Sequence, residues 1–201
     1  MLLGAVISFI GAIVLVQIID IGEKETSKKE DKIVKVKNEE PALSMEVEEI
    51  KSPISGRVIE LEKVNDPVFS SGAMGKGIAI EPTDNKIYAP FNGTIEFIAD
   101  TKHAIGLLSE DGVELLIHVG MDTVKMQGRG FDIKTSVSSK VKSGDLLLEF
   151  DRSAIEKEGY PLVTPVVITN ADNYEDKKLC INEEVKNGKA IINLKKLGIT
   201  Q

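Results

Sequence analysis

The sequence predicts an all-β domain built from short strands, preceded by an apolar helix and a charged linker. Short runs rich in β-branched residues recur from Glu46 onward, and Gly, Pro, Asn and Asp separate them. Tryptophan is absent and aromatic residues make up 4% of the chain, so Ile, Val and Leu are expected to form the core. The residues before Glu46 lack this strand pattern.

Residues 1–21 are predicted to form a transmembrane helix. The run from Leu2 to Ile19 is almost wholly apolar, and at about 1.5 Å per helical residue it nearly spans a bilayer core. Lysines follow this run and none precedes it, which places its C-terminal side in the cytoplasm. A signal peptide is the alternative, but a basic n-region and a cleavage site are missing. We expect a single-pass anchor in the cell membrane, resembling the end of a longer membrane protein.

Residues 22–45 are predicted to be a flexible linker. The stretch from Gly22 to Glu40 is mostly Lys, Glu, Asp, Ser and Thr, with no sustained apolar period. Pro41 marks its end. The folded domain is expected over residues 46–175, and residues 176–201 are expected to be a C-terminal extension that adds the last strand or strands.

Seven runs within the domain are predicted to be strands, because each is apolar or β-branched and bounded by turn residues. In chain order they are Arg57–Leu61, Gly77–Ile80, Thr94–Ile98, Ile105–Leu108, Val113–Val119, Leu146–Phe150 and Val163–Ile168. The best helix candidate is the short segment Ser153–Glu158.

A short sequence pattern occurs twice among these strands and is called the internal echo below. The segment from Pro53 to Glu60 and the segment from Pro90 to Phe97 both read P-x-x-G-x-[VI]. Lys142-Ser143-Gly144-Asp145 offers a further turn before a strand. Turns that feed strands in this way are typical of barrel-sandwich folds, although coincidence is the alternative for so short a pattern.

Charge and cysteine content exclude several classes of function. The net charge is −7, and no basic patch with interleaved aromatic residues is present, so nucleic-acid binding is not expected. An acidic chain fits a partner that presents Arg or Lys. The single cysteine, Cys180, excludes an internal disulfide and fits a reducing compartment. Its expected role is that of a small, partly buried apolar residue.

The two histidines of the chain, His103 and His118, flank the turn signal Ser109-Glu110-Asp111-Gly112. With a four-residue loop at 109–112 the two imidazoles face each other directly across a hairpin. A two-residue loop at Asp111-Gly112 places them diagonally, still on one face. Paired imidazoles on a sheet indicate either a phosphoryl site or a metal site.

Alternation along the strands assigns the faces of this hairpin. Leu115, Ile117 and Val119 share the face expected to meet the core, whereas Glu114, Leu116, His118 and Gly120 share the other. Thr101, His103 and Ile105 are expected to share a face of the partner strand, so that Thr101 can hydrogen-bond the ring of His103.

The string Gly112–Val124 resembles the active-site signature of the glucose-type IIA domains of the bacterial phosphoenolpyruvate-dependent sugar phosphotransferase system. The likeness extends from about residue 50 to 170, through Ile50–Gly56, Gly77–Ile80, Tyr88–Pro90, Thr101–Ala104, Lys125–Phe131 and Thr164–Ile168. It implies an all-β barrel-sandwich of the duplicated hybrid motif type. The N-terminal segment is similar to the last transmembrane helix of the IIC domain that precedes IIA in multidomain transporters.

The resemblance implies a role for each candidate site residue. His118 matches the phosphorylated histidine, His103 the second histidine, and Thr101 a threonine that hydrogen-bonds within the site. The implied activity is that of a phosphotransferase that accepts a phosphoryl group from the phosphocarrier HPr and passes it to a cysteine of a IIB domain for sugar uptake through IIC. No cofactor is required.

A docking surface for these partners is implied as well. Asp66 and Asp122 match acidic positions that meet arginines of HPr, although a role in turns is the alternative for both. The apolar positions of the surface match Val68, Phe69, Met74, Leu116, Val119 and Val124, with ordinary core packing as their alternative. The sequence departs from the best-known members at Ala99, Leu116 and Val119, which are aliphatic where those members are aromatic.

Other functions fit less well. A zinc endopeptidase of the lysostaphin type needs more ligands, including an H-x-H pair that this chain lacks. Zinc bound by His103 and His118 is possible only as a secondary property, with a partner completing the four ligands. Val124-Lys125-Met126 only faintly resembles the modified-lysine turn of biotinyl and lipoyl carriers. A regulatory protein that inhibits other transporters or enzymes when unphosphorylated is the main alternative to the transport function.

Overall fold

The computed structural model describes residues 47–197. The predicted transmembrane helix at 1–21 and the predicted linker at 22–45 lie outside the described residues. Among residues 47–197, no helix combines the length and the apolar character that crossing a membrane requires.

Strands dominate the described part of the chain, which confirms the all-β prediction. The strands are β1 (Val47–Lys51), β2 (Gly56–Glu60), β3 (Lys76–Pro82), β4 (Lys86–Tyr88), β5 (Gly93–Ile98), β6 (Ala104–Ser109), β7 (Glu114–His118), β8 (Phe131–Ile133), β9 (Lys140–Val141), β10 (Leu146–Phe150), β11 (Thr164–Ile168), β12 (Tyr174–Leu179), β13 (Glu184–Val185) and β14 (Ala190–Lys196). The helices are α1 (Pro67–Ser70) and α2 (Arg152–Lys157), with 3-10 turns η1 (Leu61–Lys63), η2 (Thr123–Met126) and η3 (Ala171–Asn173).

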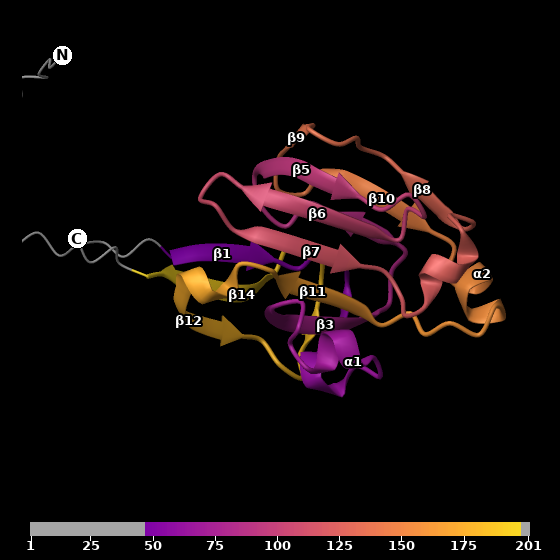
Figure 1. The fold of residues 1–201 in the computed structure, drawn as a ribbon, viewed down its shortest axis with the longest axis horizontal. Helices are drawn as coiled ribbons and strands as arrows, with labels where there is room; N and C mark the ends of the chain where they lie inside the picture. The colour runs from indigo at the N-terminus through magenta and orange to yellow at the C-terminus, as the bar shows by residue number, and fades with distance from the viewer. Residues whose placement is uncertain (1–46, 198–201) are drawn as a thin grey trace, which may run out of the picture. The chain divides into compact units, whose positions relative to one another are not determined.

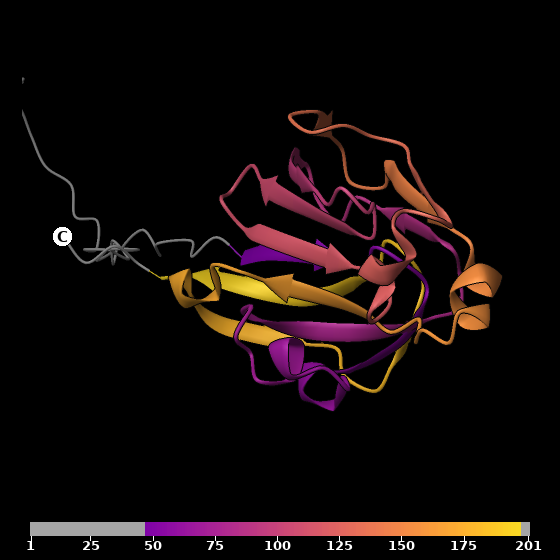
Figure 2. The same ribbon diagram turned by 45° about the vertical axis from the view of Figure 1, so that its right-hand side comes forward.

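The described residues form three sheets. The largest has the order β13-β2-β3-β11-β7-β6-β5-β9, and the smaller ones have the orders β1-β14-β12 and β4-β10-β8. Figure 1 shows β5, β6, β7, β11 and β3 side by side, with β8 and β10 beside α2 and with β1, β14 and β12 at the other end. Figure 2 shows the same layers after rotation.

Aliphatic side chains fill the space between the sheets, as the composition predicts. Ile78 and Ile80 of β3, Ile117 of β7 and Val166 of β11 have at most 1% of their surface exposed. Each belongs to one large apolar cluster that all three sheets share. This cluster fixes the strands that carry the two histidines.

The internal echo corresponds to a structural repeat. Gly56 begins β2 and Gly93 begins β5, and a Cβ atom at either position would lie 2.2 Å from the carbonyl oxygen of a neighbouring strand. Glycine is therefore required at both positions because the backbones approach so closely. Reciprocal hydrogen bonds link the starts of the two segments. Tyr88 N–H donates to the Pro53 carbonyl, and Lys51 N–H donates to the Pro90 carbonyl.

All seven predicted strand runs coincide with strands, and α2 matches the predicted helix within one residue at each end. The sequence did not reveal the shorter or more polar strands, such as β9 with only two residues. It also missed α1, a four-residue helix that begins at Pro67.

Candidate functional site: a buried histidine pair

The β6–β7 hairpin differs in register from both of the expected loops. Ala104 pairs with His118 and Leu108 with Glu114, and Ser109 N–H donates to the Val113 carbonyl, which leaves a loop of residues 110–112. Gly112 in this loop has φ +92°, which suits a three-residue hairpin loop with a glycine at its left-handed position. His103 and His118 are therefore not directly opposite each other.

The two histidines meet because the chain leaves strand geometry just before β6. Lys102 has φ +61°, so His103 follows a turn instead of continuing the strand. The prediction that Thr101, His103 and Ile105 share one face is thus wrong, since Ile105 belongs to the core. The predicted juxtaposition of the imidazoles is nevertheless found, with ring centroids 4.6 Å apart and planes at 81°.

His103 is held from the side of the turn. Its Nδ1 lies 2.7 Å from the Thr101 hydroxyl, as the sequence predicted. The side chain is 7% exposed. Burial lowers the pKa of His103, while a hydrogen bond from the ring to the Thr101 backbone opposes that shift. His103 is therefore neutral at neutral pH and is oriented by Thr101.

His118 is held from the opposite side. Its Nδ1 lies 2.8 Å from the Gly120 carbonyl oxygen, and the ring of Phe69 stands edge-on to it at 5.1 Å between centroids. Burial, followed by the nearby His103, lowers the pKa of His118 to about 4. Because a carbonyl oxygen only accepts hydrogen bonds, the proton of the neutral ring resides on Nδ1 and the lone pair on Nε2.

A hollow of about 620 Å³ adjoins the histidine pair along β5, β6 and β7. His103, His118, Met74, Leu116 and Phe97 are among the residues that line it. Glu96 and Glu114 add carboxylates to its lining. The hollow is mainly apolar and carries negative charge, which suits a partner with an apolar face and basic side chains.

Some residues of the predicted docking surface are exposed, and others are not. Val68, Met74 and Val124 are 50%, 38% and 49% exposed. Val119 is fully buried, so its assignment to the docking surface is wrong; alternation turns it toward the core. Phe69 is 6% exposed and packs beside His118 instead of forming the surface.

The two predicted acidic positions have local structural roles. The Asp66 carboxylate accepts hydrogen bonds from Val68 N–H at 2.8 Å and Phe69 N–H at 3.4 Å, and so caps α1. Asp122 has φ +59° and pairs with Lys125 at 2.9 Å. Both remain close to the site, because Asp66 positions Phe69 and Asp122 follows Gly120 by two residues.

Sequence reasoning missed two contributors to the site. Phe97 is half exposed on β5 and lines the hollow; a single aromatic residue in a strand gave no signal. The Gly120 carbonyl orients His118, although the sequence placed Gly120 only on the same strand face as His118. A glycine two residues after a histidine in the signature was the available clue.

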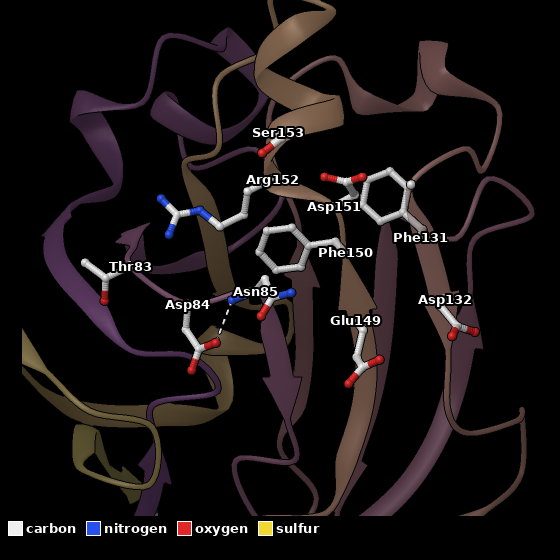
Figure 3. A pocket seen from close by; sticks show the side chains of 11 residues that line it. Thr83, Asp84, Asn85, Phe131, Asp132, Glu149, Phe150, Asp151, Arg152 and Ser153 are labelled. Carbon is white, nitrogen blue, oxygen red and sulfur yellow. Dashed lines mark hydrogen bonds between the residues drawn. The ribbon is translucent and has the colours of Figure 1, made fainter.

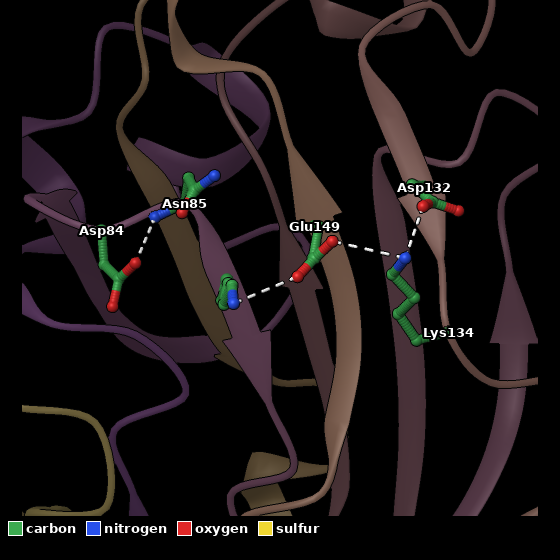
Figure 4. Close-up of polar contacts among 6 residues, drawn as sticks. Asp84, Asn85, Asp132, Lys134 and Glu149 are labelled. Carbon is green, nitrogen blue, oxygen red and sulfur yellow. Dashed lines mark hydrogen bonds and ion pairs between the residues drawn. The ribbon is translucent and has the colours of Figure 1, made fainter.

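A second hollow, of about 640 Å³, lies at β8, β10 and the start of α2. Figure 3 shows Phe131 and Phe150 there, with Arg152, Asp151 and Asp84 around them. No histidine or cysteine of the described chain lines it. In Figure 4 one carboxylate oxygen of Glu149 contacts Lys134, and Lys134 also contacts Asp132. The other carboxylate oxygen of Glu149 contacts Lys86. Glu149 and Asp132 of this hollow are thus paired with lysines, and its lining offers no imidazole or thiol, so the histidine pair is the better candidate site.

The described residues do not form a complete metal site. Between residues 47 and 197, no three His, Cys, Asp or Glu side chains are grouped so as to hold one ion. The two imidazoles would supply two ligands of the usual four. Zinc at His103 and His118 therefore stays a prediction that needs ligands from a partner.

Comparison with known proteins identifies the relatives of this chain. It is 55% identical over 123 residues to the β-glucoside-specific EIIBCA component of Dickeya chrysanthemi, covering 61% of this chain and 20% of that protein. It is 48% identical to the glucose-specific EIIA component of Buchnera aphidicola, covering 65% of this chain and 81% of that protein. The chain thus spans about a fifth of the β-glucoside-specific relative.

Fold and family comparisons agree with these relatives. The glucose permease IIA from Mycoplasma capricolum superimposes with a TM-score of 0.68 at 32% identity, covering 74% of this chain and 96% of that one. A profile of the phosphoenolpyruvate-dependent sugar phosphotransferase system EIIA 1 family matches residues 48–174, which include β2 to β11 and both histidines. The chain therefore belongs to the EIIA 1 family of the phosphoenolpyruvate-dependent sugar phosphotransferase system.

Proposed function

We propose that His118 carries the phosphoryl group in this chain. Its family makes the chain a phosphotransferase component of a sugar-uptake system. The observation that carries the proposal is the contact between His118 Nδ1 and the Gly120 carbonyl at 2.8 Å. It leaves the Nε2 lone pair available as the nucleophile. With a pKa of about 4, the ring is neutral at neutral pH and needs no base to activate it.

The exchange of N–P bonds moves no proton between the two rings, because the donor phosphohistidine carries a proton on its other ring nitrogen and leaves as a neutral imidazole. His118 Nε2 attacks the phosphorus of a phosphohistidine on the donor, HPr. A new N–P bond forms as the donor N–P bond breaks, and the donor imidazole keeps that electron pair. In the onward step a cysteine thiolate of a IIB domain attacks the phosphorus, and the electron pair of the broken bond returns to Nε2. The protein's task in both steps is to align the groups and to stabilise charge.

His103 and Thr101 stabilise the transferred charge. The His103 ring stands beside His118 at 4.6 Å between centroids, and a phosphoryl group there brings about two negative charges. This charge favours the protonated form of His103, which then donates from both ring nitrogens, one of them to the Thr101 hydroxyl at 2.7 Å. His103 thus takes up a proton from solvent and becomes cationic when the phosphoryl group arrives.

The exposed surface of the domain supports HPr and a IIB domain as its partners. Met74 and Leu116 line the hollow, and Val68 and Val124 are exposed; we expect HPr and the IIB domain to contact these residues in turn. We place the IIA domain in the cytoplasm, tethered to the cell membrane by the segment at 1–21 and working with a IIC sugar permease. Any zinc at His103 and His118 would be completed by a partner's side chains.

Phosphoryl transfer from radiolabelled phosphoenolpyruvate through enzyme I and HPr tests this function. Wild-type protein should take up label and lose it when a IIB domain is added. His118→Ala should take up none. His103→Gln should still be labelled but pass the group on about 10²-fold more slowly, by analogy with the loss of an oxyanion donor. Label on the His118→Ala protein would contradict the assignment.

A further inference from the structure

The peptide group between Gly120 and Met121 is fixed at both of its ends. Its carbonyl oxygen lies 2.8 Å from His118 Nδ1, and its N–H donates to the Pro161 carbonyl at 2.9 Å. In a planar trans peptide the N–H and C=O bonds point in opposite directions. The hydrogen bond to Pro161 therefore determines that the Gly120 carbonyl points toward the histidine.

The preceding peptide group is held by Thr123. The Thr123 hydroxyl donates to the Val119 carbonyl at 2.6 Å, and the side chain is fully buried. Gly120 has φ +71°, and a Cβ atom there would lie 2.6 Å from Thr123 Cγ2 and 2.9 Å from the Pro161 carbonyl oxygen. Thr123 and Pro161 thus enclose the Gly120 backbone so closely that only glycine fits without displacing it.

The carbonyl of Pro161 is itself held in place. Pro161 lies in the loop between α2 and β11, where Tyr160 N–H donates to the Ile155 carbonyl of α2 at 3.2 Å. On the other side, the hydroxyl of the buried Thr164 donates to the Leu162 carbonyl at 2.9 Å. Proline also fixes its own φ. The loop is a rigid support because both of its ends are tied to the core.

We propose that Pro161 and Thr123 are positioning residues that hold the Gly120 carbonyl against His118 and thereby keep its proton on Nδ1. This inference deepens the proposed function and rests on it, since it explains how Nε2 stays free for phosphorus. The acceptor on Nδ1 is a backbone oxygen, which has no proton to give. The protein sets the tautomer through backbone geometry, and that geometry depends on a loop some 40 residues further along the chain.

Three variants test the positioning role of Thr123 and Pro161. Thr123→Val keeps the shape of the side chain but removes its hydroxyl, Thr123→Ser keeps the hydroxyl, and Pro161→Gly frees the φ angle at an exposed position. Nitrogen-15 NMR of the His118 ring distinguishes a protonated nitrogen from an unprotonated one. We expect Nδ1–H alone in the wild type and in Thr123→Ser. Thr123→Val and Pro161→Gly should show a growing Nε2–H population.

Phosphoryl acceptance from phospho-HPr should fall with the tautomer, by at least about tenfold in Thr123→Val and Pro161→Gly but not in Thr123→Ser. If both folded variants keep the wild-type tautomer, the proposal is overturned. If Thr123→Val does not fold, the exposed Pro161→Gly decides alone. Failure of the wild type to take up label would contradict the proposed function. The His118 tautomer, measured in the unphosphorylated protein, would still show whether Pro161 and Thr123 position the Gly120 carbonyl.

Discussion

The proposed chemistry depends on two imidazoles that are held by different partners. His118 is fixed through Nδ1 by a backbone carbonyl, and His103 through Nδ1 by a threonine hydroxyl. A carbonyl accepts only, whereas a hydroxyl both donates and accepts. His118 therefore has a fixed tautomer suited to a nucleophile, and His103 can adapt to the charge beside it.

The adaptable partner of His103 predicts a shift in its pKa. Burial lowers the pKa of His103 in the unphosphorylated protein. A phosphoryl group on His118 favours the cation, so the pKa of His103 should rise on phosphorylation. An NMR pH titration of the His103 ring, with and without the phosphoryl group, measures this shift. An unchanged pKa would show that His103 does not stabilise the charge of the phosphoryl group.

The low pKa of His118 predicts that acid destabilises the fold. A histidine with a pKa of about 4 in the folded state and about 6.5 when unfolded binds protons more readily when unfolded. Its stabilising contribution is complete above about pH 6.5 and is lost as the pH falls toward 4, by up to about 3 kcal/mol.

Urea unfolding of the wild type and His118→Gln at several pH values isolates this effect, because the carboxylates titrate in both proteins. The difference between their free energies of unfolding should change steadily from pH 6.5 to 4. A difference that does not vary with pH would show that His118 is not buried as a neutral ring.

At the scale of elements, strand alternation predicted the faces of β7 correctly but not the register of the hairpin. Leu115 and Ile117 are buried and His118 faces the site, as a period of two requires. The loop length depended on Gly112 adopting φ +92°, and the approach of His103 depended on φ +61° at Lys102. Gly112 indicates a left-handed position but fits a loop of two, three or four residues, and Lys102 gives no signal for a left-handed turn, so the sequence alone did not determine the register.

The cap of α1 allows the two roles of Asp66 to be separated. Asparagine caps a helix about as well as aspartate, whereas alanine costs about 1 kcal/mol. Asp66→Asn should therefore keep the Phe69–His118 contact but weaken HPr binding, and Asp66→Ala should lose both. Calorimetric affinities for HPr and the NMR shifts of the Phe69 ring report the two effects. If Asp66→Asn bound HPr as tightly as the wild type does, the Asp66 carboxylate would act only as the cap of α1.

At the scale of the whole molecule, the strongly apolar strands were predictable and the short polar ones were not. The seven apolar runs all coincide with strands, because burial on a sheet leaves a clear pattern. Strands such as β9 and β13 have two residues each and gain their pairing from the repeat that joins β2 to β13 and β5 to β9. Only tertiary contacts define them, so their sequences carry almost no signal.

Neighbouring valines show how the fold divides the signature between core and surface. Val119 is fully buried, and Val124 is 49% exposed. Val119→Ala should lower the free energy of unfolding by about 2 kcal/mol and leave HPr affinity unchanged. Val124→Ala should change stability by less than about 0.5 kcal/mol but weaken HPr binding.

Urea unfolding and calorimetric titration with HPr, applied to both variants, provide the comparison. Equal loss of HPr affinity in the two proteins would indicate that Val119 reaches the docking surface after all. Equal loss of stability would indicate that Val124 packs within the fold.

In the proposed function, Nε2 of His118 is the atom that carries the phosphoryl group. Phosphorus–nitrogen coupling in NMR spectra of the phosphorylated, nitrogen-15-labelled protein identifies that atom directly. We predict one phosphorus coupled to Nε2 of His118, with Nδ1 still protonated and hydrogen-bonded to the Gly120 carbonyl. Phosphorus on Nδ1, on His103 or on any other side chain would contradict it.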